Sequence, residues 1–281
     1  MIYSNKIWIS GADGRLGSKL VEMLNPVDVE ILATDKDTVD VSVSSEVIRF
    51  ADRNRPDYII NCSAITDAGR CEENNDEAFK VNGLGARNMA VAANRINAKL
   101  IHLSSDDVFD GLARFPYKEY DEAKPNSCYG KSKLFGEKQV ASFCSRFFII
   151  RSSWIYGSKY KRVEDIIEKA NEGEDILVPK DQFAAPTSAE ELAKFIIYIM
   201  ETTEYGIYHA VCRGSCSRKE FAEKILELKG ITGKVIETEE MIDARFGPDY
   251  SVLDDFVLRI TGDYEFPRWE DALADYMNTV K

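Results

Sequence analysis

The sequence predicts a Rossmann-type α/β fold, a doubly wound parallel sheet with a smaller C-terminal substrate-binding region. The first observation is a glycine-rich turn at 11–17, which joins a short apolar strand to an apolar-periodic helix. This is the context in which such a turn binds a dinucleotide. The second is a regular alternation of strand-like and helix-like stretches. The expected strands are 6–10, 30–34, 58–62, 99–103 and 147–151, and the expected helices include 44–54, 76–94 and 129–144.

This alternation becomes irregular after residue 157, and that change suggests how the chain of 281 residues is divided. We expect a dinucleotide-binding Rossmann domain at 1–157 and a mainly substrate-binding region at 158–281. Some elements of the second region, at about 187–201, are expected to return to the Rossmann domain.

The turn at 11–17 contains Gly11, Gly14 and Gly17, which permit a tight turn and close approach of the backbone to a ligand. The N-terminus of the next helix presents free N–H groups and a positive dipole end to a pyrophosphate. Asp35 ends the second strand, where an acid can accept hydrogen bonds from ribose hydroxyls. Arg15 and Lys36 are close by and could instead meet the 2′-phosphate of NADPH, so the choice between NADH and NADPH stays open.

Tyr129 and Lys133 are four residues apart, so on a helix their side chains lie on one face, one turn apart. A nearby cation favours the phenolate and can lower the pKa of a tyrosine by roughly 1–3 units. Such a tyrosine can exchange a proton with an alcohol or an alkoxide. The spacing alone is equally typical of an exposed helix face, and only the rest of the chain favours the catalytic interpretation.

The composition excludes several classes of protein. A formal charge of −12 argues against general affinity for nucleic acid or anionic membranes. No apolar run approaches the ~20 residues of a membrane span and no signal peptide is visible, so we expect a cytoplasmic protein. The six cysteines and two histidines show no C-x-x-C pair, so no metal site is expected. An acidic surface is compatible with a homodimer without requiring one.

The motifs together resemble the extended short-chain dehydrogenase/reductases, and among these the dTDP-4-dehydrorhamnose reductase family. The resemblance covers nearly the whole chain. In the first half it rests on 11–17, Asp40-Val41, 55–57, 78–82, 104–106, 108–111 and 129–133. In the second half it rests on 151–154, Asp181-Gln182, 250–254 and 267–269.

The resemblance implies reduction of the ketone of a nucleotide-linked 4-keto-6-deoxy sugar by NADPH or NADH, within dTDP-L-rhamnose biosynthesis. It implies that Tyr129 donates the proton and that Lys133 holds the nicotinamide ribose and lowers the pKa of Tyr129. Ser105, in the position of the family's threonine, would hydrogen-bond the substrate oxygen. Asp106 and Trp154 would contact the sugar.

The same resemblance implies a larger set of residues around the dinucleotide. This set is Gly11, Gly14, Arg15, Leu16, Gly17, Asp35, Asp40, Val41, Ala64, Ile65, Thr66 and Leu103, together with Tyr129 and Lys133.

Three departures from the family pattern put the identity of the sugar in doubt. Asp107 replaces the usual tyrosine, which changes size and charge beside the sugar. Ala184 replaces a glycine. The arginine that usually precedes the proline at Pro248 is replaced by Gly247, with Arg245 two residues earlier.

Two alternatives stay open. An epimerase or dehydratase on the same scaffold would recycle a tightly held NAD, so co-purified NAD would favour it. A non-catalytic regulatory subunit, similar to that of methionine adenosyltransferase, would act through protein contacts. The intact set of Ser105, Tyr129 and Lys133 argues against the second alternative.

Overall fold

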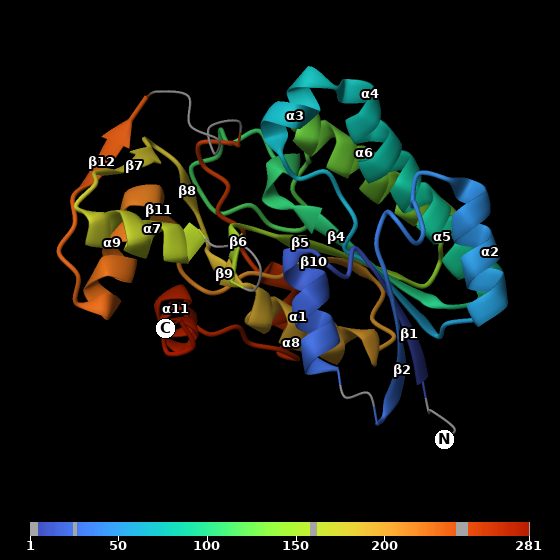
Figure 1. Cartoon of the computed structure of the whole chain (residues 1–281). Helices are drawn as coiled ribbons and strands as arrows, with labels where there is room; N and C mark the ends of the chain where they lie inside the picture. Colours follow the sequence, from blue (N-terminus) through green and yellow to red (C-terminus); the bar gives the residue numbers. More distant parts are fainter. Residues whose placement is uncertain (1–4, 25–26, 158–161, 240–246, 281) are drawn as a thin grey trace.

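A computed structural model describes residues 5–24, 27–157, 162–239 and 247–280, and shows a central parallel sheet covered by helices on both faces (Figure 1). The sheet has six strands in the order β10-β5-β4-β3-β1-β2. They are β1 (Asn5–Ser10), β2 (Val29–Thr34), β3 (Tyr58–Asn61), β4 (Lys99–Ser105), β5 (Phe147–Ser152) and β10 (Gly206–His209). The predicted fold class is confirmed.

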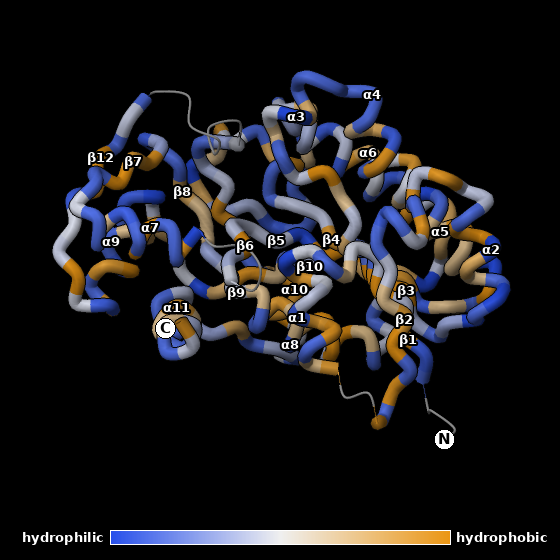
Figure 2. The backbone as a smooth tube through the Cα atoms, in the orientation of Figure 1, coloured by the Kyte–Doolittle hydropathy of each residue, from blue (hydrophilic) through white to orange (hydrophobic). Residues whose placement is uncertain are grey.

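Alternation along β1 explains why both faces of the sheet are covered. Ile7 and Ile9 pack in one core with Leu20 of α1 (Arg15–Met23), whereas Trp8 packs in a second core with Val47 and Met89. Strands that are apolar on both faces need helices on both sides. The second core is closed by α2 (Ser44–Asn54), α5 (Gly85–Ile96) and α6 (Cys128–Phe143). Figure 2 shows hydrophobic residues concentrated along the central strands.

The single helix expected at 76–94 is wrong in detail. After α3 (Ala68–Glu73) the chain forms α4 (Asn75–Ala78), a π-helical segment η1 (Phe79–Leu84) and then α5. Asn82 explains the irregularity, because its side chain pairs with both backbone groups of Ile65 and donates to Ser132 of α6. Gly136 of α6 also packs so closely that an added Cβ would lie 2.4 Å from the Asn82 carbonyl oxygen.

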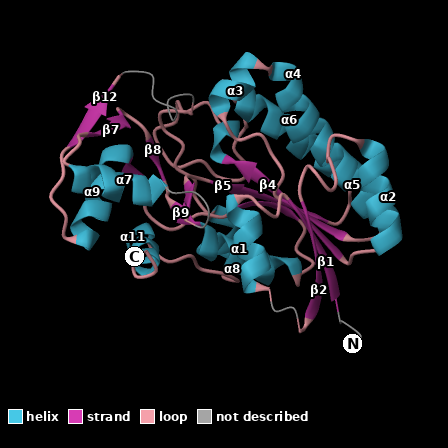
Figure 3. Ribbon diagram, in the orientation of Figure 1, coloured by secondary structure: helices cyan, strands magenta, loops and turns pink. Residues whose placement is uncertain are grey.

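The C-terminal half forms a smaller layer beside the carboxyl ends of the sheet strands (Figures 1 and 3). Its short strand pairs are β6–β9, β7–β12 and β8–β11. The strands are β6 (Ile155–Tyr156), β7 (Ile176–Pro179), β8 (Phe183–Ala184), β9 (Thr187–Ser188), β11 (Cys216–Ser217) and β12 (Val235–Thr238). The helices are α7 (Arg162–Glu172), α9 (Arg218–Lys229), α10 (Phe256–Thr261) and α11 (Trp269–Met277).

Two elements of this half lie against the Rossmann sheet. Helix α8 (Ala189–Met200) packs on α1, and β10 extends the sheet in parallel beyond β5. The elements of the C-terminal half that return to the Rossmann domain therefore include β10 in addition to the expected stretch at 187–201. The division of the chain at residue 157 itself stays a prediction.

Within the described residues, no helix is both long enough and apolar enough to span a bilayer. The same residues contain no group of three or more His, Cys, Asp or Glu side chains arranged to hold a metal ion.

Candidate functional site

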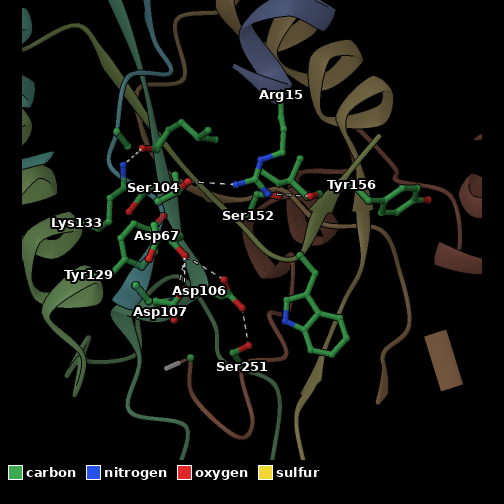
Figure 4. A pocket seen from close by; sticks show the side chains of 18 of the residues that line it. Arg15, Asp67, Ser104, Asp106, Asp107, Tyr129, Lys133, Ser152, Tyr156 and Ser251 are labelled. Carbon is green, nitrogen blue, oxygen red and sulfur yellow. Dashed lines mark hydrogen bonds between the residues drawn. The ribbon is translucent and has the colours of Figure 1, made fainter. Parts of the chain in front are cut away.

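A cavity of about 580 Å³ lies at the carboxyl ends of the central strands, where open α/β sheets bind ligands. Its walls come from both halves of the chain (Figure 4). Of the residues predicted from the sequence, it is lined by Gly14, Arg15, Leu16, Gly17, Ala64, Thr66, Leu103, Ser105, Asp106, Tyr129, Lys133 and Trp154.

Tyr129 is placed by the first turn of α6. Ser127 caps this helix by accepting a hydrogen bond from the Gly130 N–H at 3.0 Å. Gly130 is required by close packing, because a Cβ there would lie 2.0 Å from the carbonyl oxygen of Asp107. This contact brings the start of α6 against the end of β4, so Tyr129 lies beside Ser105.

Lys133 follows Tyr129 by one turn and is buried. Its Nζ donates a hydrogen bond of 2.5 Å to the carbonyl oxygen of Leu103 in β4. Burial lowers the pKa of Lys133 to about 8, although the carboxylate of Glu137 opposes this change. Figure 4 shows Lys133 and Tyr129 on the same helix, with Arg15 entering the cavity from another side.

The lowered pKa that was expected for Tyr129 is not found in this structure, where the net shift is upward. Burial raises the pKa of Tyr129 because it disfavours the phenolate, and the neighbouring Asp107 carboxylate raises it further. A hydrogen bond with Ser105 opposes these effects only in part. Tyr129 is therefore a protonated phenol at neutral pH, which is the form that donates a proton.

A buried ion pair supports the helix that bears Lys133. Glu137 accepts hydrogen bonds from Arg151 of β5 at 2.9 and 2.7 Å and from Ser104 of β4 at 2.5 Å. The Arg151 guanidinium also lies over the ring of Phe109, 5.2 Å from its centroid. These bonds tie α6 to two central strands directly below the cavity.

Two neighbouring acids follow β4, in the short 3₁₀ turn η2 (Asp106–Val108). Asp106 is buried and accepts hydrogen bonds from Ser153 at 2.7 Å and from Ser251 at 2.5 Å. Ser105 is close to both acids, 3.1 Å from Asp106 Oδ1 and 2.9 Å from Asp107 Oδ2. Burial and the adjacent Asp106 raise the pKa of Asp107 to about 7.

The glycine turn fits a dinucleotide pyrophosphate. A Cβ added at Gly17 would lie 2.1 Å from the Gly11 carbonyl oxygen, and a Cβ added at Gly11 would lie 2.8 Å from the Ser63 backbone nitrogen. Side chains are therefore excluded at both positions of the turn. Helix α1 has no side-chain cap and no acid in its first turn. The residues at its N-terminus, 14–17, line the cavity, so the free N–H groups there offer an anion site. Arg15 adds a cation, held by hydrogen bonds of 3.3 Å to the Ile155 carbonyl and the Thr66 hydroxyl.

Five of the predicted cofactor residues do not line this cavity. Asp35 lies beside the glycine turn, where its carboxylate accepts a 2.7 Å hydrogen bond from the Asp13 N–H. Asp40 binds the Ser42 N–H at 2.8 Å. The remaining three are Gly11, Val41 and Ile65. Gly11 belongs to the glycine turn, Val41 packs in the second core, and Ile65 is hydrogen-bonded to Asn82.

Arg218 and Phe221 of the C-terminal half line the cavity but were not predicted from the sequence. Arg218, the first residue of α9, lies over Trp154 with its guanidinium carbon 3.4 Å from the ring centroid. Its Nε donates a 3.2 Å hydrogen bond to Gln182. Trp154 has a φ of 40°, a left-handed conformation that is strained for a bulky residue. Ser217 and Glu220 form a capping box at the start of α9, but no pattern in the sequence predicts the position of this helix against Trp154.

The three departures from the family pattern have different positions. Asp107 and Gly247 line the cavity, whereas Ala184 is buried in β8 and does not line it. Arg245 lies outside the described residues.

Comparison with known proteins gives consistent relatives. The family model of the RmlD substrate binding domain matches residues 5–281. The spore coat polysaccharide biosynthesis protein SpsK of Bacillus subtilis is 34% identical, over 97% of this chain and 96% of that protein. The dTDP-4-dehydrorhamnose reductase of Aggregatibacter actinomycetemcomitans is 33% identical, over 88% of this chain and 87% of that protein.

Solved structures agree with these relatives. The dTDP-4-dehydrorhamnose reductase of Bacillus anthracis, in complex with NADP, superposes with a TM-score of 0.94 and 34% identity, over 98% of this chain and 99% of that one. The UDP-glucose 4-epimerase of Thermus thermophilus, in complex with NAD, has a TM-score of 0.83 at 18% identity over 98% of this chain and 100% of that one, a likeness of fold alone.

Proposed function

This chain belongs to the family of the RmlD substrate binding domain, and we propose that it reduces the 4-keto group of a dTDP-linked 6-deoxy sugar in dTDP-L-rhamnose biosynthesis. It is an NAD(P)H-dependent oxidoreductase with a Rossmann-type fold. The observation that carries the proposal is that Tyr129, Lys133 and Ser105 share one cavity with the glycine turn at the N-terminus of α1.

NAD(P)H supplies a hydride to the ketone carbon when it is bound in this cavity. The residues of the chain then manage the charge that develops on the ketone oxygen. Tyr129 is a protonated phenol and gives its proton to that oxygen, and Ser105 donates a hydrogen bond that orients the ketone. Lys133, held by the Leu103 carbonyl, is placed to hold the nicotinamide ribose.

The cofactor is held along the wall that α1 contributes. The backbone of Gly14 and Gly17 and the guanidinium of Arg15 would bind the pyrophosphate, while Ala64 and Thr66 would border the ribose and nicotinamide. Asp35, beside the glycine turn, would select between NADH and NADPH at the adenosine ribose, with dual use expected.

The nucleotide sugar is held between the two halves of the chain. Asp106 and Trp154 are the predicted sugar contacts, and Gln182 and Arg218 extend the same wall. The Arg218 cation also offers the substrate diphosphate a charge partner.

A steady-state assay tests the proposal. The purified protein, mixed with dTDP-4-dehydrorhamnose and NADPH or NADH, should oxidise the nicotinamide and reduce one sugar for each cofactor consumed. Tightly bound NAD in the purified protein, with net conversion of a sugar but no net oxidation of NAD(P)H, would favour the epimerase or dehydratase alternative. Binding of NAD(P)H without turnover of any 4-keto sugar would favour the regulatory-subunit alternative.

A cytoplasmic location and a homodimeric state, both considered from the sequence, stay predictions. Cell fractionation and sedimentation equilibrium would test them.

A further inference from the structure

Asp107 is connected to Tyr129 through a single hydroxyl group. The Asp107 carboxylate lies 2.9 Å from Ser105 Oγ, and the same hydroxyl is hydrogen-bonded to the Tyr129 phenol. The Asp107 N–H also donates to Ser105 Oγ at 3.2 Å, which fixes the hydroxyl between the two groups. All three residues line the cavity.

The packing of α6 makes this arrangement rigid. The Asp107 carbonyl oxygen occupies the space where a Cβ of Gly130 would lie, so the residue after Tyr129 is in direct contact with Asp107. Asp107 is half-buried and borders the cavity, whereas Asp106 is buried and bound to Ser153 and Ser251. Both acids line the cavity, and Asp107 is the more exposed of the two.

The charges around Asp107 favour a carboxyl that holds a proton near neutral pH. Burial and the Asp106 carboxylate raise the pKa of Asp107 to about 7, and Arg218 of α9 opposes them. Tyr129 is its uncharged neighbour on α6. The other titratable groups that line the same cavity are Arg15 of α1, Cys62 after β3, Asp67 before α3, Lys133 of α6, Tyr156 of β6 and Arg162 of α7.

We propose that Asp107 supplies the proton for reduction through Ser105 and Tyr129. This inference rests on the proposed keto-sugar reductase function and identifies a relay residue for that reaction. As hydride reaches the ketone carbon, the Tyr129 O–H bond breaks and its proton bonds to the ketone oxygen. As the Tyr129 proton leaves, the Ser105 hydroxyl turns from the ketone oxygen to the Tyr129 oxygen and gives it a proton, and the Asp107 carboxyl proton moves to the Ser105 oxygen.

The sequence of transfers balances. The sugar gains a hydride and a proton and becomes an alcohol, Tyr129 and Ser105 end as they began, and Asp107 becomes a carboxylate. Asp107 then takes a proton from cavity water. The direction of the hydrogen bond between Asp107 and Ser105 reverses between the two states, which a hydroxyl group permits because it both donates and accepts.

The relay predicts a specific pH dependence. Above the pKa of Asp107 the relay has no proton to give, so kcat/KM for reduction should fall as pH rises through about 7. Tyr129 cannot cause a fall in that range, because burial raises the pKa of its phenol from an already high value. Lys133, whose pKa is about 8, can also lower kcat/KM in the alkaline range, so the fall near 7 is assigned to Asp107 by its loss in the variant below. A flat kcat/KM from mildly acidic to mildly alkaline pH would overturn the relay.

Asp107→Asn is the test variant, since asparagine keeps the size and accepts the Ser105 hydrogen bond but has no carboxyl proton. We expect kcat/KM at acidic pH to fall by ~10²-fold, at the low end of general acid catalysis, and the decline near neutral pH to disappear. Asp107→Glu, which keeps a carboxyl group, should retain a titration. A merely structural role of Asp107 would lower activity at every pH without removing the titration.

Asp110→Asn is the matched control. Asp110 lies on the same segment, but it accepts hydrogen bonds from Tyr117 and the Leu112 N–H and its pKa is lowered, so it should leave the midpoint of the profile unchanged. Cofactor binding and circular dichroism would confirm that each variant is folded. An Asp107→Asn enzyme that keeps the wild-type midpoint and rate overturns the relay alone, whereas a wild-type enzyme with no keto-sugar turnover overturns the proposed function.

Discussion

Replacing Glu137 with glutamine should lower the free energy of unfolding by about 3–5 kcal/mol, because it leaves a buried cation without its partner. The Arg151 and Glu137 side chains are only 4% and 3% exposed and form a hydrogen bond of 2.7 Å. The side-chain NH₂ of glutamine would face one N–H of the Arg151 guanidinium. Because both groups are donors, one of the two hydrogen bonds between Arg151 and residue 137 would be lost.

The magnitude follows from the surroundings of Arg151. Among the described contacts of its guanidinium are the two bonds to Glu137, a nitrogen of His209 at 3.5 Å and the face of Phe109. Burial and the nearby Arg151 lower the pKa of His209 to about 3, so this histidine is neutral and cannot balance the charge. The expected loss therefore corresponds to an unpaired buried charge and not to the small net value of an exposed ion pair.

The same substitution should affect Lys133. The Glu137 carboxylate raises the pKa of Lys133, against the effect of burial, so its removal should shift that pKa below about 8. The amino group would then be less charged at neutral pH, and NAD(P)H affinity should decline most in the alkaline part of the pH range.

Urea unfolding followed by circular dichroism measures the stability. Glu190→Gln is the matched control, because the Glu190–Lys194 pair is exposed, at 47% and 46%, and should contribute less than ~1 kcal/mol. If Glu137→Gln lowered the free energy of unfolding no more than Glu190→Gln does, the loss of its buried partner would not destabilise the fold through Arg151.

Three further predictions concern the cavity. Tyr129→Phe should lower kcat by ~10²–10⁴-fold while NAD(P)H binding is retained, whereas Tyr120→Phe, at an exposed tyrosine, should leave kcat unchanged. Stopped-flow turnover measures kcat and cofactor fluorescence measures NAD(P)H binding. Near-normal turnover of Tyr129→Phe would contradict its role as proton donor. Gly17→Ala should cost ~1–3 kcal/mol of stability and weaken cofactor binding, because its Cβ would lie 2.1 Å from the Gly11 carbonyl oxygen; an unchanged melting temperature and Kd would refute the close packing. Asp35→Ala should weaken NADH binding more than NADPH binding in titration calorimetry, and equal losses would place Asp35 away from the ribose.

The parts of the fold that depend on local pattern were predictable from the sequence. The strand before Gly11 and the alternation up to Arg151 follow from apolar spacing and glycine. The π-helical segment around Asn82 was not predictable, because it depends on contacts with Ile65 and Ser132 that are distant in the sequence.

The candidate site was also predictable from the sequence only in part. The spacing of Tyr129 and Lys133 predicted that their side chains share one helix face, and both line the cavity in the structure. The spacing could not show that the Lys133 amino group is bound by a β4 carbonyl, or that burial dominates the pKa of Tyr129. Arg218 was missed because its place over Trp154 depends on how the irregular C-terminal half folds back.

Transfer of deuterium from labelled cofactor tests the central claim most directly. NADPH or NADH carrying deuterium at nicotinamide C4 should be incubated with the protein and dTDP-4-dehydrorhamnose, with the product examined by mass spectrometry and NMR. The account predicts a reduced sugar with one deuterium on its C4 carbon when the transferred face is labelled. A product without deuterium from either labelled face, or cofactor binding with no product at all, would contradict it.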